Sequence, residues 1–469
     1  MWSSLKLLHP KNLAKEVHVY GYHFSWKTQG IWMLAVLAGI STVGAVFKLA
    51  APGFFLVTAV AVCLLPLLVL DMYKKMYEQK RFADAADYME QVLYSFLKTG
   101  KVLSALKESR ELFDQGLMRQ TLDQAIRHME TGRSDSSLGI LNESLQIVEN
   151  RYQCRKIHMI HNLLKNVENY GGEAEDSVML LLEDLELWKK RGYHLQAEKK
   201  KSHTDNVISI TVAVVLCAVA LYVIDGMKGL FAARSDVNIF QIGIIQASSV
   251  LFLLFLYYVY VKSARSLTAG WLKEESGKEE SYIRQCWRIV KDYDSGSVKR
   301  KRFGYRLAKK DVTKEMRLAL PEWLMEMALL LQHNNVEVAV QKSRERAPAV
   351  LWGELDELIG RMKRSPGQAG VYTGFCKEFD LPEVAGCMKM MHAISENGTG
   401  DVRIQMNHFI SRVNEMQAAA DQLQNQTATF HMRLIFSYPV VAATAKLLLD
   451  MTTGMIVMFQ ILGSMGVAQ

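Results

Sequence analysis

Long apolar runs alternate with charged segments along this chain. Two apolar runs, residues 207–224 and 237–261, lie near the middle and are separated by a short polar turn. Each has the roughly 20 apolar residues that a helix needs to cross a bilayer. Another pair precedes them at residues 31–49 and 54–70, and a last run covers residues 434–467. The pattern predicts a multi-pass α-helical membrane protein with large water-exposed segments.

The charged segments between these runs carry the periodicity of amphipathic helices. Val178, Leu181, Leu182 and Leu185 recur at the i, i+3, i+4 and i+7 positions of one helix face. We therefore predict an all-α fold. Its expected parts are a cytoplasmic arm (1–30), a transmembrane hairpin (31–71), a helical domain (72–205), a second hairpin (206–262), a basic connector (263–315), a second helical domain (316–432) and a C-terminal transmembrane segment (433–469).

Local signals place the predicted turns and the arm. Residues 51–53, Ala-Pro-Gly, predict the tight turn of the first hairpin, and Pro321 suits a helix start. The arm carries four aromatic residues, whose rings favour the headgroup region of a bilayer. They are Tyr20, Tyr22, Phe24 and Trp26.

Positive charge gathers at the ends of the apolar runs. The chain has 56 Lys and Arg against 48 Asp and Glu, a net charge of +8. Lys residues flank the first hairpin, residues 199–201 precede the second, and Lys262 and Arg265 follow it. Since cytoplasmic loops are enriched in Lys and Arg, we expect the arm and both helical domains in the cytoplasm. With no cleavable signal peptide before residue 31, the expected location is the cell membrane.

Two regions match at nearly constant spacing, which predicts an internal duplication. In each, a short turn precedes an amphipathic helix, and a later glycine turn precedes a long helix that leads into the membrane. The matched pairs are Leu97 with Leu331, Val102 with Val336, Ala105 with Ala339 and Ser109 with Ser343 at a shift of 234, then Gly172 with Gly400, Glu173 with Asp401, Leu181 with Phe409 and Leu185 with Val413 at a shift of 228.

These repeats resemble the type II secretion system F family. The motifs that carry the resemblance are LKTGKVLSALKESRE and VENYGGEAEDSVMLLLEDL in the first copy, then LLLQHNNVEVAVQKSRERAP and MHAISENGTGDVRIQMNHFISRVNEM in the second. The leading hairpin resembles the tight-adherence (Tad) pilus members most. Two features depart from the family pattern: the second copy ends in one membrane run, and the first copy lacks a match for Pro348.

The resemblance implies an inner-membrane platform of a type II secretion, type IV pilus or Tad pilus machine. Such a platform couples a cytoplasmic ATPase to pilin or pseudopilin assembly, and it is expected to be neither an enzyme nor a cofactor carrier. The expected partners are that ATPase, pilin-like subunits, other platform subunits, the lipid bilayer and further copies of the chain. A signalling scaffold that transports nothing is an alternative function to the platform.

Catalytic and nucleotide-binding motifs are weak. Residues 270–278 hold two glycines, the second followed by Lys278, but the glycines are too far apart for a phosphate loop, and Glu279 replaces the magnesium-binding Ser or Thr. The Ser104-to-Lys107 SxxK spacing lies within the amphipathic repeat helix, where a surface position is favoured over a nucleophile. Six scattered cysteines without a CxxC motif argue against a disulfide framework or a zinc site.

The basic connector leaves two interpretations open. Between Arg284 and Lys310 it has ten Lys or Arg against two Asp, with aromatic residues interspersed. Aromatic rings among basic residues suit RNA, but no RNA-binding fold motif accompanies them. A solvated face or a contact with anionic lipid is favoured, and no nucleic acid partner is expected.

Histidines and acids give two further candidates. His158 and His161 share a helix face, but two His cannot close a zinc site alone, so solvated histidines are favoured. An acidic cluster surrounds the glycine pair at 171–172, where calcium is one interpretation and helix capping with partner docking is favoured. The cluster comprises Glu168, Glu173, Glu175 and Asp176, and the docking candidates are Gly172, Glu173, Gly400 and Asp401.

Lys446 and Asp450 stand four residues apart within the last apolar run, on one helix face. A lone charge at mid-membrane costs several kcal/mol. We therefore predict an intramembrane ion pair that faces other helices, rather than a Lys446 that extends to the interface. The pair also supports an alternative function, a transporter, although a transporter should have more spans and polar residues in several of them.

Overall fold

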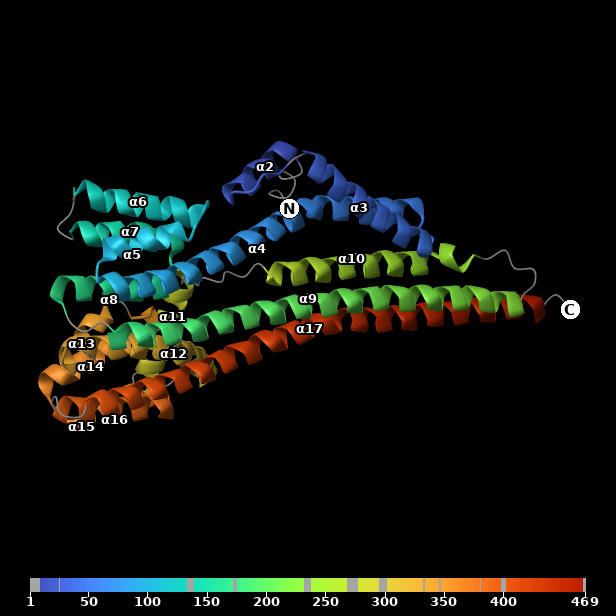
Figure 1. Ribbon diagram of the computed structural model, residues 1–469. Coiled ribbons are helices and arrows are strands. Elements are labelled where there is room, and N and C mark those ends of the chain that lie inside the picture. Colours follow the sequence, from blue (N-terminus) through green and yellow to red (C-terminus); the bar gives the residue numbers. More distant parts are fainter. Residues whose placement is uncertain are drawn as a thin grey trace. The chain divides into compact units, whose positions relative to one another are not determined.

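The computed structural model describes residues 9–24, 26–132, 139–171, 175–231, 238–267, 277–294, 302–331, 334–345, 347–379, 381–397 and 402–466. Every regular element among them is helical, which confirms the all-α prediction (Figure 1). The chain divides into two compact units. The apolar unit comprises Met1–Ala83, Gly192–Trp271 and Ala428–Gln469, and the polar unit comprises Asp84–Arg191 and Leu272–Thr427.

The apolar unit supplies the candidate membrane spans. Its elements are α2 (Pro10–Val19), α3 (Trp26–Val46), η1 (Ile239–Gln241), α10 (Gly243–Ser266) and the apolar parts of α4 (Ala51–Thr99), α9 (Glu175–Phe231) and α17 (Val402–Gly466). Within the described residues, five helices are long and apolar enough to cross a membrane: α3, α4, α9, α10 and α17. The chain therefore has the make-up of a membrane protein.

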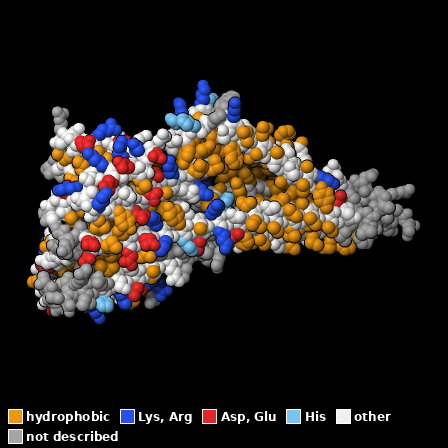
Figure 2. All heavy atoms as spheres, in the orientation of Figure 1, with side chains coloured by type: hydrophobic (Ala, Val, Ile, Leu, Met, Phe, Trp, Pro, Cys, Tyr) orange, Lys and Arg blue, Asp and Glu red, His pale blue; other side chains and the backbone are white. Residues whose placement is uncertain are grey.

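Large apolar side chains of this unit point outward. Leu34 is 68% exposed, Leu251 68% and Phe459 71%. Figure 2 shows hydrophobic side chains spread over the visible face of the apolar unit, with few charged ones among them. Such a surface is unfavourable in water but suits lipid.

The polar unit is a helical bundle with buried apolar side chains. Its helices are α5 (Val102–Glu111), α6 (Leu117–Thr131), α7 (Ile140–Tyr152), α8 (Arg155–Tyr170), α11 (Gly277–Asp294), α12 (Arg302–Leu331), α13 (Val336–Arg344), η2 (Ala349–Leu351), α14 (Trp352–Arg364), α15 (Ala369–Thr373), η3 (Lys377–Phe379) and α16 (Pro382–Asn397), with the polar ends of α4, α9 and α17. Its fully buried side chains include Tyr88, Tyr152, Trp323, Phe379 and Phe409.

Three helices have residues in both units. α4 leaves the apolar unit after Ala83, α9 enters it at Gly192, and α17 enters it at Ala428. The change in composition along the sequence predicts domain boundaries near residues 71, 205 and 432, but no helix ends there. Backbone hydrogen bonds run along a helix axis and continue through a change from apolar to polar side chains.

Helices of the two segments that match in sequence bury corresponding positions. α5 buries Val102, Ala105, Leu106 and Ser109, and α13 buries Val336, Ala339, Val340 and Ser343, at the predicted shift of 234. An arginine on each of these helices then pairs with the next long helix, Arg110 with Asp123 and Arg344 with Asp356. The helices α8 in the first segment and α16 in the second are also equal in length, with 16 residues each.

The turn of the first hairpin lies before the predicted position. Residues 51–53 form the first turn of α4, and the chain reverses at residues 47–50, where Lys48 has φ 45°. Pro52 is tolerated because the first helical N–H groups have no intrahelical acceptor. The predicted turn at residues 51–53 is therefore wrong by a few residues.

Prolines 321 and 439 both lie inside helices, α12 and α17. The predicted helix start at Pro321 is wrong. An internal proline removes one backbone hydrogen bond. Around Pro321 the helix is buried on its neighbours through Leu320, Trp323 and Leu324, and this packing offsets the loss.

The arm folds back on α4. Leu13 and Val17 of α2 are buried against Leu65 and Val69. The rings of the arm stack on tyrosines of α4, Tyr20 on Tyr77 at 5.3 Å and Tyr22 on Tyr73 at 5.5 Å between ring centroids. These ring contacts therefore hold the arm against α4.

Candidate functional site: a buried polar centre in the apolar unit

Lys446 and Asp450 form an ion pair inside the apolar unit. The Lys446 Nζ lies 2.8 Å from Asp450 Oδ2, and their side chains are 2% and 0% exposed. Both residues are on α17, one turn apart, so the helix itself sets their spacing. Since both side chains are buried against protein, Lys446 does not extend toward an interface.

α10 completes this polar centre, which we define as Lys446, Asp450, Ser248 and Ser249. Lys446 Nζ donates to Ser249 Oγ at 2.9 Å and to Ser248 Oγ at 3.2 Å. Ser248 Oγ also lies 3.1 Å from Asp450 Oδ1. The three donors of the ammonium group thus have three acceptors, and both carboxylate oxygens have a partner. The charges cancel and are fully hydrogen-bonded, as burial requires.

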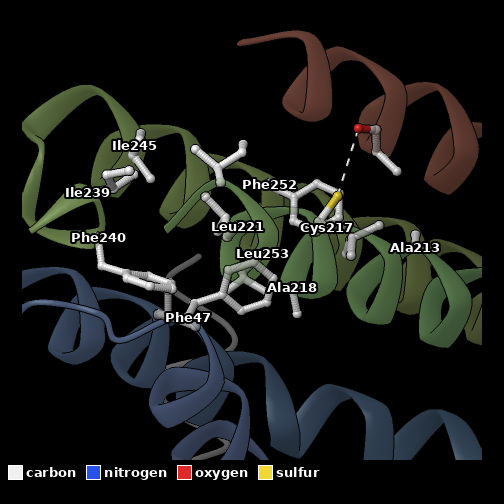
Figure 3. Close-up of a cluster of buried hydrophobic side chains, with 14 residues drawn as sticks. Phe47, Ala213, Cys217, Ala218, Leu221, Ile239, Phe240, Ile245, Phe252 and Leu253 are labelled. Atoms are coloured by element: carbon white, nitrogen blue, oxygen red, sulfur yellow. Dashed lines mark hydrogen bonds between the residues drawn. The ribbon is translucent and has the colours of Figure 1, made fainter. Parts of the chain in front are cut away.

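An apolar cluster lies beside the polar centre. Figure 3 shows its side chains, with Phe47, Leu221, Phe252 and Leu253 pointing toward one another from three parts of the chain. The Phe47 ring centroid lies 5.7 Å from Lys446 Nζ. Low dielectric surroundings strengthen the attraction between Lys446 and Asp450.

Small residues bring α9 close to α17. Cys217 Sγ donates to the carbonyl oxygen of Ala443 at 3.7 Å, and the bond is drawn in Figure 3. A Cβ atom on Gly454 would lie only 2.7 Å from Ile224. Close backbone approach of this kind is typical of packed membrane helices. The polar centre is therefore held between α10 and α17, with α9 alongside.

A second cluster lies in the polar unit. Glu149 of α7 accepts from both predicted histidines, with His161 Nδ1 at 2.9 Å from Oε1 and His158 Nδ1 against Oε2. The Tyr88 hydroxyl lies 2.7 Å from His161 Nε2. His161 is fully buried. The expectation of solvated histidines is therefore wrong for His161, and within the described residues no three His, Cys, Asp or Glu side chains are arranged to hold a metal.

Burial and hydrogen bonds set the protonation states of His161 and Glu149. Burial lowers the pKa of His161, and nearby Glu149 only partly opposes the shift. Burial on its own would raise the pKa of Glu149, but hydrogen bonds from His158 and His161 hold it well below its usual range. At neutral pH His161 is thus neutral, donating from Nδ1 to the Glu149 carboxylate and accepting from Tyr88 at Nε2.

Acid should destabilise the polar unit through His161. The pKa of His161 is lower in the folded than in the unfolded state. Its contribution to the stability of the polar unit is therefore complete above about pH 6.5 and declines as the pH falls. His161→Gln keeps a donor and an acceptor but takes up no proton. We expect this variant to lose less thermal stability than the parent between pH 7.5 and pH 5.5. Equal losses would show that other groups set the acid sensitivity.

A hollow of about 350 Å³ opens beside this cluster between α7, α8, α12 and the residue that follows α13. Its lining includes Glu149, Cys154, His158, Glu322 and Glu345. At one edge Arg155 pairs with Glu322 at 3.1 Å, joining α8 to α12. α8 and α12 therefore meet at a charged contact.

A buried carboxylate anchors the connector. Glu354 of α14 is fully buried and accepts from Lys291 Nζ at 2.8 Å, from Trp287 Nε1 at 3.2 Å and from the Cys376 N–H at 3.2 Å. Trp287 packs so close to Gly353 that a Cβ there would lie 2.4 Å from its ring. The basic connector thus contributes a helix, α11, that is packed into the polar unit.

The remaining residues singled out in the sequence do not form a common site among the described residues. Gly172, Glu173, Gly400 and Asp401 lie outside the described residues, as do residues 270–276. Glu168 accepts from the Val102 N–H at 2.8 Å and so caps the start of α5, the capping role favoured for the acidic cluster. Lys107 pairs with Glu130 at 2.7 Å.

Sequence reasoning found Lys446 and Asp450 but missed their serine partners. A serine within an apolar run gives no periodic signal, and its role depends on which helix packs beside it. Glu149 and Glu354 were missed because their roles, too, depend on which helices pack beside them. No family model, no curated protein and no solved structure matches this chain, so its function is argued from the arrangement of its own residues.

Proposed function

We propose that the chain is a membrane platform that passes motion between its polar unit and its membrane helices. The observation that carries the proposal is the sharing of α4, α9 and α17 between the two units. An unbroken helix transmits a displacement along its axis, whereas a loop absorbs it. Among the described residues of these helices no break separates the apolar part from the polar part.

The finer form of the proposal follows the resemblance to the type II secretion system F family. The polar unit faces the cytoplasm and contacts a secretion or pilus ATPase, and the membrane helices contact pilin-like subunits in an oligomeric assembly in the cell membrane. Matching buried positions on α5 and α13 support the duplication that this family has. The Lys and Arg residues that flank the spans support the orientation.

Weakening one shared helix tests the proposal. His194 and Ala197 are on α9, just inside the apolar unit, and neither is buried. His194→Gly with Ala197→Gly should make the helix locally flexible, at about 1 kcal/mol per glycine relative to alanine. In cells that carry the gene, we expect several-fold less surface pilus or exported protein at an unchanged membrane level of the platform.

His194→Ala is the matched control, because position 197 is already alanine and the helix keeps its stiffness. Its activity should equal that of the parent. Full activity of the double glycine variant would contradict transmission through α9. Loss of the gene without any effect on pili or export would remove the secretion hypothesis as a whole.

The polar centre favours a transporter as the second candidate. It places charges on α17 and hydroxyl groups on α10. Against this interpretation, the protein itself satisfies all three Lys446 donors, and the described residues contain five candidate spans. Ion or solute flux into liposomes that depends on Asp450 would favour the transporter over the platform.

A further inference from the structure

We propose that the apolar unit binds the phosphate headgroup of an anionic phospholipid between α4, α9 and α10, at the level where their apolar stretches end. The site, which we call the headgroup site, consists of Lys75 on α4, Lys199, Lys200, His203 and Asn206 on α9, and the hydroxyl of Ser263 on α10. All of these residues belong to the apolar unit.

The headgroup site gathers positive charge from two helices. Lys75 is half-buried and close enough to Lys200 and His203 for electrostatic repulsion. His203 Nδ1 lies 3.0 Å from Ser263 Oγ, which joins this face of α9 to α10. Two acids at the same level are paired already, Asp71 with Arg265 at 3.2 Å and Glu78 with Arg81 at 3.8 Å. Cations packed together in this way are stabilised by an anion.

A buried polar side chain provides independent evidence for a ligand. Asn206 is 1% exposed, yet neither its Nδ2 nor its Oδ1 has a hydrogen-bond partner among the described residues. Lys199, His203 and Asn206 follow the i, i+4, i+7 spacing, so Asn206 lies on the same face of α9 as the cations. One turn before Lys199, the Gln196 Nε2 is also buried without a partner in the described part of the chain. Unpartnered buried amides cost free energy, which a bound phosphate acceptor would recover.

The depth of the headgroup site favours a lipid over a soluble anion. The apolar stretch of α4 ends at Leu70, that of α9 begins at Val207, and that of α10 ends at Val261. The site residues lie between one and eight positions from these three points. Basic pockets between helices at the edge of the hydrocarbon region suit anionic headgroups, whose acyl chains then lie along the apolar helix surfaces.

Lipid titration of the purified full-length chain in detergent tests the proposal. The readout is the thermal unfolding midpoint as phosphatidylglycerol, phosphatidylcholine or inorganic phosphate is added. We expect phosphatidylglycerol to raise the midpoint at the lowest concentration. Lys75→Gln should need about five times more of it, because one cation near a lipid surface contributes about that factor, and Asn206→Leu should weaken the response as well.

Lys74→Gln is the matched control, since Lys74 is the exposed neighbour of Lys75 on the same helix. It should respond to phosphatidylglycerol like the parent, and Lys75→Arg, which keeps the charge, should restore the response. Equal midpoints in phosphatidylglycerol and phosphatidylcholine would overturn the proposal. A full response to inorganic phosphate alone would also overturn it, in favour of a soluble anion, and so would equal effects of Lys74→Gln and Lys75→Gln.

Discussion

Replacing Lys446 with Ala is expected to destabilise the apolar unit by about 3–5 kcal/mol, because it strands the Asp450 carboxylate in a buried site. Among the described residues, Asp450 would keep only the hydrogen bond from Ser248. The loss should appear as a lower thermal midpoint in detergent and several-fold less protein in the membrane. The joint change Lys446→Leu with Asp450→Leu should recover most of the loss, since removing a buried pair costs less than breaking it.

An exposed ion pair of identical spacing provides the control for Lys446. Lys190 and Glu186 on α9 are also four residues apart and also 2.8 Å from nitrogen to oxygen, but their side chains are 70% and 66% exposed. Lys190→Ala should cost about 0.5 kcal/mol or less. Equal effects of Lys446→Ala and Lys190→Ala would mean that Asp450 is solvated, and the inward-facing arrangement of α17 would be rejected.

The apolar runs predicted the spans because length and hydrophobicity alone decide whether a helix suits a bilayer. Helix continuity could not be predicted in the same way. The change from Leu70 to the charged residues after it resembles a domain boundary, but the backbone of α4 continues through it to Thr99. Composition reports what surrounds a helix, whereas its end depends on local signals such as Gly100, which has φ 64°.

The candidate site was predictable only where both partners stand on one helix. Lys446 and Asp450 meet through the i, i+4 spacing that any reader of the sequence can apply. Ser248 and Ser249 are about 200 positions away, and Glu149 meets His161 from another helix. Such contacts depend on helix packing, which the pattern of one segment does not determine.

Replacing Lys291 with Met is expected to destabilise the polar unit by about 3–5 kcal/mol, through the loss of the only cation that contacts buried Glu354 among the described residues. Burial on its own would lower the pKa of Lys291, but Glu354 and Glu357 hold it above its usual range, so the lysine is charged. Burial raises the pKa of Glu354, and without Lys291 the shift should increase. Because the pKa of Glu354 is higher in the folded than in the unfolded state, acid stabilises the folded state. The variant should therefore be less destabilised at pH 5 than at pH 8.

The rescue variant for Lys291→Met is Lys291→Met with Glu354→Gln. The new glutamine side chain is neutral and still offers an oxygen to Trp287 Nε1 and to the Cys376 N–H, which both bond Glu354 in the parent. The double variant should recover most of the thermal stability and lose the extra dependence on pH. Lys107→Met, at a pair with Glu130 that is half exposed, should cost about 0.5 kcal/mol or less. If Lys291→Met matches Lys107→Met at pH 8, Glu354 does not depend on Lys291, and α11 is held to α14 by Trp287 and its apolar neighbours alone.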